Sequence, residues 1–202
     1  EERRFVFAQY MGDVLFMKST TKKLALPLPT VAEDTNALGE VPDSTWFTNR
    51  DIDALTPEEL AVGPATSGPP VRPFKVIDGK SSGGNPGFFM EDGTGRKFLV
   101  KWDTKENPYQ QTAAGIVVNR LFWGFGYNVP SDTLFHFERD ELAIDPEAET
   151  EDDQGKDVPL TEEHLAAILE TAPVIDGGVR AIASELLPGE PIGGIAVWGT
   201  RK

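Results

Sequence analysis

Residues 97–102 (KFLVKW) constrain the fold more than any other segment, because their side chains alternate between two faces with a period of two. Phe98, Val100 and Trp102 fall on one face, and Lys101 falls on the other. A hairpin signal of aspartate and glycine precedes the segment. The chain must therefore contain a sheet with one strongly apolar face.

A helix is predicted directly after this strand. Asn107 has the properties of an N-cap, Pro108 of the first helical position and Gln110 of the third, while Gly126 ends the helix. Small and apolar residues recur at helical spacing, and we expect that face to pack on the sheet. The face consists of Ala113, Ile116, Val117, Leu121 and Gly124.

The remaining patterns complete an α+β fold, in which an antiparallel sheet carries one main packed helix. A second helix is expected over residues 161–170. Residues 139–163 hold 11 acids and 2 bases and are expected to form a solvated acidic loop. The other strands are expected at 74–77 and 88–90, at 133–137 paired with 141–144, and at 180–186 paired with 192–198.

Composition divides the chain into an irregular N-terminal arm, residues 1–70, and a domain over residues 71–202. The arm is rich in Pro, Gly and Thr from residue 27, except for a short capped helix beginning at Thr56. Its start, residues 5–17, is equally compatible with a hairpin and a short helix. We expect residues 1–50 to lie on the surface of a partner. The aromatic residues expected to bind this partner are Trp46, Phe47, Phe5 and Tyr10.

Composition also excludes several classes of protein. A net charge of −14 repels phosphate backbones and argues against nucleic-acid binding. The absence of cysteine excludes disulfide scaffolds, thiolate zinc sites and cysteine nucleophiles. His136 and His164 lie in different segments and match no hydrolase or metalloprotease motif. No transmembrane segment is expected, since the longest apolar run is interrupted and too short.

Two features suggest chemistry. The glycine-rich loop from Gly79 to Gly87 exposes backbone N–H groups that bind phosphate oxygens in other proteins, although such loops are more often plain hairpin connections. Lys101 is either a solvated lysine at a sheet edge or a phosphate contact. The order of a glycine-rich hairpin, a strand with a lysine, and a helix is that of a protein-kinase small lobe. The candidate loop residues are Gly79, Ser81, Ser82, Gly83 and Gly84.

Four motifs together resemble a group of uncharacterised bacterial envelope proteins with a kinase-like fold, distantly similar to HipA-type and phosphatidylinositol kinases. The motifs lie at residues 40–50 (EVPDSTWFTNR), 98–103 (FLVKWD), 119–130 (NRLFWGFGYNVP) and 188–194 (PGEPIGG). The resemblance implies that Lys101 contacts nucleotide phosphates, that the glycine-rich loop covers them and that Leu99 forms a wall of an adenine pocket. It also implies ATP and Mg²⁺ as cofactors and the bacterial periplasm or cell envelope as the compartment, with the cytoplasm as the alternative.

This chain departs from the family pattern at two points. No acid lies between Asn107 and Gly126, and Gly115 stands where a glutamate would pair with the lysine. The family's catalytic and metal-binding acids belong to a large lobe that follows the position of Lys202. We therefore expect a degenerate, non-catalytic interaction or accessory subunit that binds a protein partner or a C-terminal lobe. The alternative is the nucleotide-binding half of an ATP-dependent phosphotransferase.

Overall fold

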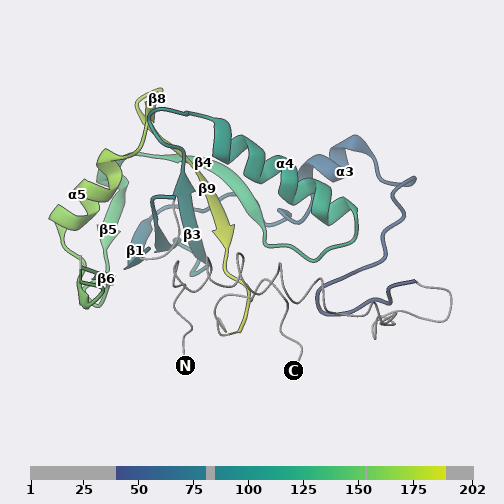
Figure 1. Ribbon diagram of the computed structural model, residues 1–202, viewed down its shortest axis with the longest axis horizontal. Helices are drawn as coiled ribbons and strands as arrows, with labels where there is room; N and C mark the ends of the chain where they lie inside the picture. Colours follow the sequence, from purple (N-terminus) through teal and green to yellow (C-terminus); the bar gives the residue numbers. More distant parts are fainter. Residues whose placement is uncertain (1–39, 81–84, 153, 190–202) are drawn as a thin grey trace, which may run out of the picture. The chain divides into compact units, whose positions relative to one another are not determined.

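The computed structural model describes residues 40–80, 85–152 and 154–189 (Figure 1). Residues 35–187 form one compact unit, to which nearly all of the described residues belong. The predictions for residues 5–17 and 192–198 lie outside the described residues, and so do those for Phe5 and Tyr10.

The main sheet has seven strands, six of them in the order β4-β9-β3-β2-β1-β5, with β8 paired to β9. All pairs are antiparallel except β1 and β5, which run parallel. The α+β prediction is therefore confirmed. The strands are β1 Phe74–Gly79, β2 Gly87–Glu91, β3 Lys97–Trp102, β4 Asp132–Phe137, β5 Leu142–Ile144, β8 Val174–Ile175 and β9 Gly178–Glu185.

The predicted pairing of 133–137 with 141–144 is wrong. β4 pairs with β9, and β5 instead adds to the far edge of the sheet beside β1. The sheet curls so strongly that Phe135 on β4 contacts Phe74 on β1, with ring centroids 5.7 Å apart, although three strands separate them in the sheet order. The chain crosses from β4 to β5 through one short 3-10 turn, η2 Arg139–Glu141, because curling brings the two edges together.

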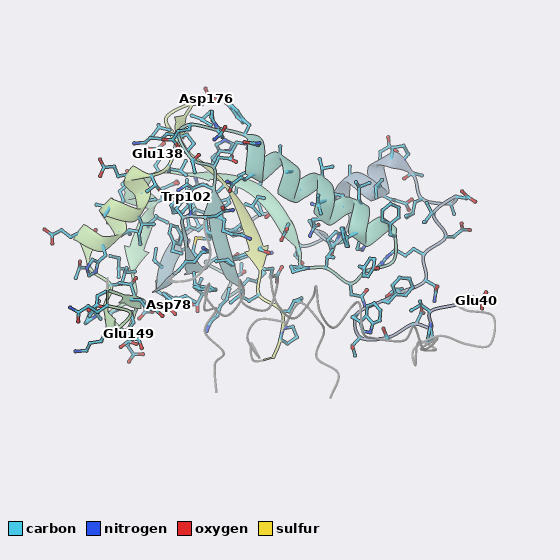
Figure 2. The ribbon with its side chains drawn as sticks, in the orientation of Figure 1. Glu40, Asp78, Trp102, Glu138, Glu149 and Asp176 are labelled. Atoms are coloured by element: carbon cyan, nitrogen blue, oxygen red, sulfur yellow. The ribbon has the colours of Figure 1, made fainter. Side chains whose placement is uncertain are left out.

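The concave side of this curled sheet holds the core. Phe88, Trp102 and Phe137 contact one another with centroids 5.5 to 6.3 Å apart, and Figure 2 shows Trp102 over the middle of the sheet. Helix α5, Glu162–Glu170, belongs to this core through the fully buried Leu165. Trp102 Nε1 donates to Thr171 Oγ1 at 3.2 Å, which ties the end of α5 to β3.

The acidic segment 139–163 is only partly a loop. The prediction of a loop over the whole segment is wrong, because the segment contains two paired strands. Strands β6 Glu149–Glu151 and β7 Asp157–Pro159 pair as an antiparallel hairpin. The Asp152 carboxylate accepts from the N–H groups of Gln154 and Lys156, and this closes the turn. Thr150 and Val158 at the centres of the two strands are half-buried, and the residues on either side of them are exposed. This alternation is typical of short strands with one side facing solvent.

The main helix, α4, spans Gln110–Gly124 and is followed by Gly126 in a left-handed conformation, as predicted. Its predicted start is wrong. Tyr109 occupies the N-cap position with a φ of 71°, and its side chain makes no capping hydrogen bond. The cap comes instead from Asp103 at the end of β3, whose carboxylate accepts from the N–H groups of Gln111 at 2.6 Å and Thr112 at 2.9 Å. Because Asp103 lies eight residues before Gln111, no pattern of adjacent residues predicts this cap.

The orientation of α4 agrees only in part with our expectation, since Gly124 is buried and Ile116 half-buried but the other three predicted residues are exposed. Thr112 and Asn119 are buried towards the sheet, while Val117 is 57% exposed and Leu121 43% exposed. Gly115 faces β9, since a Cβ there would lie 2.7 Å from Ile182 Cδ1. Part of the apolar surface of α4 therefore faces solvent, on the side of the helix away from the sheet.

The described part of the arm, residues 40–70, contacts the domain that follows it in the same chain. Thr48 N–H donates to Gly126 O at 2.7 Å, and Asn128 N–H donates to Trp46 O at 2.8 Å. Helix α3, Pro57–Val62, has the predicted capping box between Thr56 and Glu59 and packs on α4 (Figure 1). Residues 40–50, which we expected on another surface, therefore make their contacts within the same unit.

We predict that Asp103→Ala destabilises the protein by about 2–4 kcal/mol, because it leaves two helix N–H groups and the Thr112 hydroxyl without their acceptor. Asp103 is 1% exposed, so water does not replace the lost oxygens. Asp103→Asn keeps one acceptor oxygen and should lose less. Urea denaturation measures the effect, with the exposed Asp140→Ala as the matched control. Equal stability of Asp103→Ala and the control would contradict this role.

A second buried carboxylate, Asp92, holds the β2–β3 turn and the chain before β1. It accepts from the N–H groups of Val71, Thr94 and Arg96, from the Thr94 hydroxyl and from the Arg96 guanidinium, at 2.6 to 3.1 Å. Burial raises the pKa of Asp92, but these hydrogen bonds outweigh it and lower the pKa from 3.8 to about 2.

This pKa predicts a specific pH dependence. A carboxyl group with a lower pKa in the folded state stabilises the fold above its unfolded pKa and loses that stabilisation as the pH falls. Wild type should lose about 2 kcal/mol from Asp92 between pH ~4 and pH ~2. Asp92→Asn should be less stable at neutral pH and show a shallower decline over this window, as measured by urea denaturation at a series of pH values. Parallel pH profiles for the two proteins would rule out this contribution.

Candidate functional site

Two of the predicted site residues, Lys101 and Leu99, lie on the convex face of the sheet. The strand register places Lys101 opposite Gly87 on one side and Ile182 on the other. Leu99 lies two residues earlier on the same face, opposite Phe89 and Ser184. The structure thus brings Lys101 and Leu99 together on one half-buried surface.

Helix α4 reaches this surface beside Lys101 but brings no carboxylate to it. Gly115 packs on Ile182, the residue that pairs with Lys101 across the ladder. A glutamate at this helical position would therefore lie close to the lysine. In this chain the position carries no side chain, and none of the ion pairs among the described residues involves Lys101.

The charges nearest to Lys101 are Lys80 and Asp132. Burial lowers the pKa of Lys80, and the positive charge of Lys101 lowers it further. Lys80 Nζ donates to the carbonyl oxygen of Asn85 at 2.5 Å, across the base of the glycine-rich loop. Two lysines therefore lie near each other at this end of the hairpin.

Asp132 lies on β4, beyond β9 from Lys101. Burial raises the pKa of Asp132, while a hydrogen bond from Ser184 lowers it. The Ser184 hydroxyl donates to Asp132 Oδ1 at 2.5 Å. The positive charges of Lys101 and Arg120 also lower the pKa. Asp132 is thus hydrogen-bonded to Ser184, its cross-strand neighbour on β9. It makes no ion pair with Lys101, and the two charges attract each other only at longer range.

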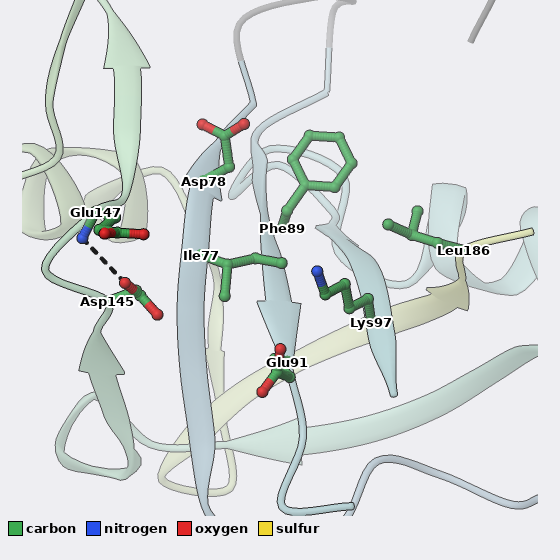
Figure 3. Close-up of a pocket in the computed structure, with 8 residues that line it drawn as sticks. All are labelled: Ile77, Asp78, Phe89, Glu91, Lys97, Asp145, Glu147 and Leu186. Atoms are coloured by element: carbon green, nitrogen blue, oxygen red, sulfur yellow. Dashed lines mark hydrogen bonds between the residues drawn. The ribbon is translucent and has the colours of Figure 1, made fainter. Parts of the chain in front are cut away.

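A hollow of about 490 Å³ opens on the convex face over β1 to β3 (Figure 3). Its apolar part consists of Ile77, Phe89 and Leu186. Four carboxylates and one lysine complete the lining, so the hollow is acidic and repels phosphate unless cations are present. The charged residues are Asp78, Glu91, Lys97, Asp145 and Glu147.

The loop residues divide into two groups. Ser81, Ser82, Gly83 and Gly84 lie outside the described residues. Gly79 ends β1, where a Cβ would lie 2.3 Å from Thr150 Oγ1 on β6. This close approach accounts for glycine at position 79 by packing alone, without a bound phosphate.

The two aromatic residues of the arm that the structure describes pack on the loop after α4. Phe47 and Tyr127 meet edge to face with centroids 5.7 Å apart, and Trp46 lies 6.1 Å from the same tyrosine. Phe47 is half-buried there, while Trp46 is 47% exposed. These rings hold the arm on its own domain, and Trp46 retains an open side.

The exposed apolar side of α4 overlaps only in part with the face that we expected to pack on the sheet, because the two share Val117 and Leu121 alone. The exposed apolar side of α4, here called the α4 stripe, follows an i, i+3, i+4, i+7 spacing. The periodicity was visible in the sequence, but periodicity does not indicate which side faces the sheet. The stripe consists of Ala114, Val117, Val118, Leu121 and Phe125.

No protein-family model, curated protein or solved structure matches this chain. Within the described residues, no cluster of histidine and carboxylate side chains has the size and geometry to hold a metal ion. No described helix is long and apolar enough to span a membrane.

We predict that Mg-ATP produces no thermal shift in this chain, because Lys101 has no carboxylate partner among the described residues and the hollow over β1 to β3 is lined by four carboxylates and one lysine. Differential scanning fluorimetry of wild type and Lys101→Ala, each with and without Mg-ATP, measures this. The two proteins should respond alike. A shift of several degrees in wild type that Lys101→Ala abolishes would contradict the prediction.

Proposed function

We propose that this chain is a non-catalytic interaction module, built on a kinase small-lobe-like sheet, that binds a protein partner through the α4 stripe. The observation that carries the proposal is the exposed apolar side of α4. Its polar residues Thr112 and Asn119 are buried against the sheet, whereas Val117 and Phe125 are each 57% exposed.

Exposed apolar side chains in this arrangement are unfavourable in free energy unless another surface covers the stripe. Burying an exposed Val, Leu or Phe side chain contributes about 1.5–3 kcal/mol, and large contiguous apolar patches on soluble proteins mark interaction sites. α4 has four large apolar side chains on one exposed side, while α3 and the sheet occupy the other sides. A partner that covers the stripe would gain this free energy on binding.

The kinase-like part of the proposal is supported by the order of elements. A glycine-rich hairpin, a third strand with Lys101 and the helix α4 follow one another as in a kinase small lobe. The missing helix glutamate supports loss of catalysis, because an ion pair at ~4 Å is worth about 4 kcal/mol before desolvation. The proposed location in the cell envelope is supported only by the resemblance of the sequence motifs.

The second candidate is a nucleotide-binding half of an ATP-dependent phosphotransferase, with ATP and Mg²⁺ under the glycine-rich loop. The nearness of Lys80 and Lys101 at the base of that loop favours it. The thermal-shift experiment above separates the two functions, because this candidate requires a response to Mg-ATP that depends on Lys101.

Affinity purification of the tagged chain from its source organism tests the proposal. The double variant Val117→Ser, Leu121→Ser should lose the stoichiometric partner that wild type retains, because it removes two apolar side chains from the centre of the stripe. The control is Val174→Ser on β8, which removes an apolar side chain that is 72% exposed. A partner that binds the double variant and wild type equally would refute the proposal, as would a purification that yields no stoichiometric partner.

A further inference from the structure

A groove continues the α4 stripe at the carboxyl end of the helix. Its volume is about 220 Å³, and its lining is mainly apolar. An apolar cavity of about 150 Å³ accommodates benzene, so this groove has room for a Leu or Phe side chain. It is lined by Ile52, Leu55, Thr56, Pro57 and Leu60 from the arm and α3, and by Leu121, Gly124 and Phe125 from α4 and its end.

The walls of the groove are held in place by specific contacts. Arg120 Nε donates to Ala61 O at 2.8 Å and joins α3 to α4. A Cβ at Gly124 would lie 2.9 Å from Leu60 Cδ1, so glycine allows the two helices to approach closely. The groove is therefore preformed, and a ligand does not have to open it.

The rim of the groove on the arm side is acidic. Residues 51–71 contain four carboxylates and no lysine or arginine. Asp51 and Asp53 flank the groove residue Ile52 in the sequence and are exposed, and Glu58 is exposed on α3 beside Pro57. The fourth carboxylate, Glu59, is engaged in the capping box with Thr56.

The two arginines nearest to this rim are already engaged. Arg50 donates to the carbonyl oxygen of Trp123 at 2.9 Å and lies over its ring at 4.6 Å. Arg120 donates to the carbonyl oxygens of Ala61 and Asp132 at 2.8 Å. Neither guanidinium pairs with the rim, and none of the ion pairs among the described residues involves Asp51, Asp53 or Glu58.

We infer that the α4 stripe and its groove bind a basic amphipathic helix of a partner protein. The inference rests on the proposed function and specifies the chemistry of the partner. An apolar helix face with i, i+4, i+7 anchors lies along the stripe and places one large side chain in the groove. Lysine or arginine residues flanking that face meet the rim of Asp51, Asp53 and Glu58, so the charges are complementary.

The test uses two fluorescent peptides of about five helical turns, each with leucines on one face. One has lysines at all other positions and the second has glutamates there. Fluorescence anisotropy with the full chain should detect binding of the lysine peptide and none of the glutamate peptide. Raising the salt concentration should weaken binding of the lysine peptide, because screening acts on the exposed rim.

Two sets of variants locate the binding site. Leu121→Ser with Phe125→Ser, and Asp51→Asn with Asp53→Asn and Glu58→Gln, should each weaken the lysine peptide about tenfold. The matched control removes three exposed carboxylates elsewhere, Asp140→Asn, Glu163→Gln and Glu170→Gln. It should change the affinity little. Circular dichroism confirms that each variant folds, which is expected because every substituted side chain is exposed.

The other outcomes overturn the inference. Equal binding of both peptides removes the charge argument, and equal loss in the control variant shows attraction to the overall negative charge only. Sedimentation showing a dimer that Leu121→Ser with Phe125→Ser dissociates would assign the stripe to a second copy of this chain. If the purification experiment finds a stripe-dependent partner but neither peptide binds, the proposed function stands and the inference about the partner fails.

Discussion

The contact between Phe74 and Phe135 is the constraint on which the other parts of the structure depend. It joins two strands that have three other strands between them in the sheet order, so it exists only because the sheet curls. Curling encloses the aromatic side chains on the concave side, together with Leu165 of α5. The convex side is therefore left with mixed chemistry, and α4 rests there on Thr112, Gly115 and Asn119.

Two buried carboxylates attach the connecting segments to this curled sheet. Asp103 caps α4 from the end of β3, and Asp92 binds the segment that leads into β1 through Val71 N–H. Each accepts several hydrogen bonds that an apolar residue would leave unpaired. The helix and the arm therefore keep fixed positions without contributing to the aromatic core, and the outward side of α4 is free to be apolar.

The convex face illustrates why a motif does not by itself establish an activity. Lys101 pairs with Ile182 across the ladder, and Gly115 of α4 approaches the same isoleucine. The charged groups nearest to Lys101 are nevertheless a second lysine, Lys80, and Asp132 at a greater distance. The α4 stripe has the simpler property of exposed apolar area next to an acidic rim, and this property favours binding of a protein over catalysis.

Elements with local signals could be predicted from the amino-acid sequence. The period of two in residues 97–102, the capping box at Thr56 and the glycine after α4 each depend on neighbouring residues. Three other features became clear from the folded chain: which edges of the sheet meet, that Asp103 rather than Asn107 caps α4, and which side of α4 faces outwards. These features depend on contacts between distant segments, and a periodic pattern defines a helix face without specifying whether the sheet or the solvent lies against it.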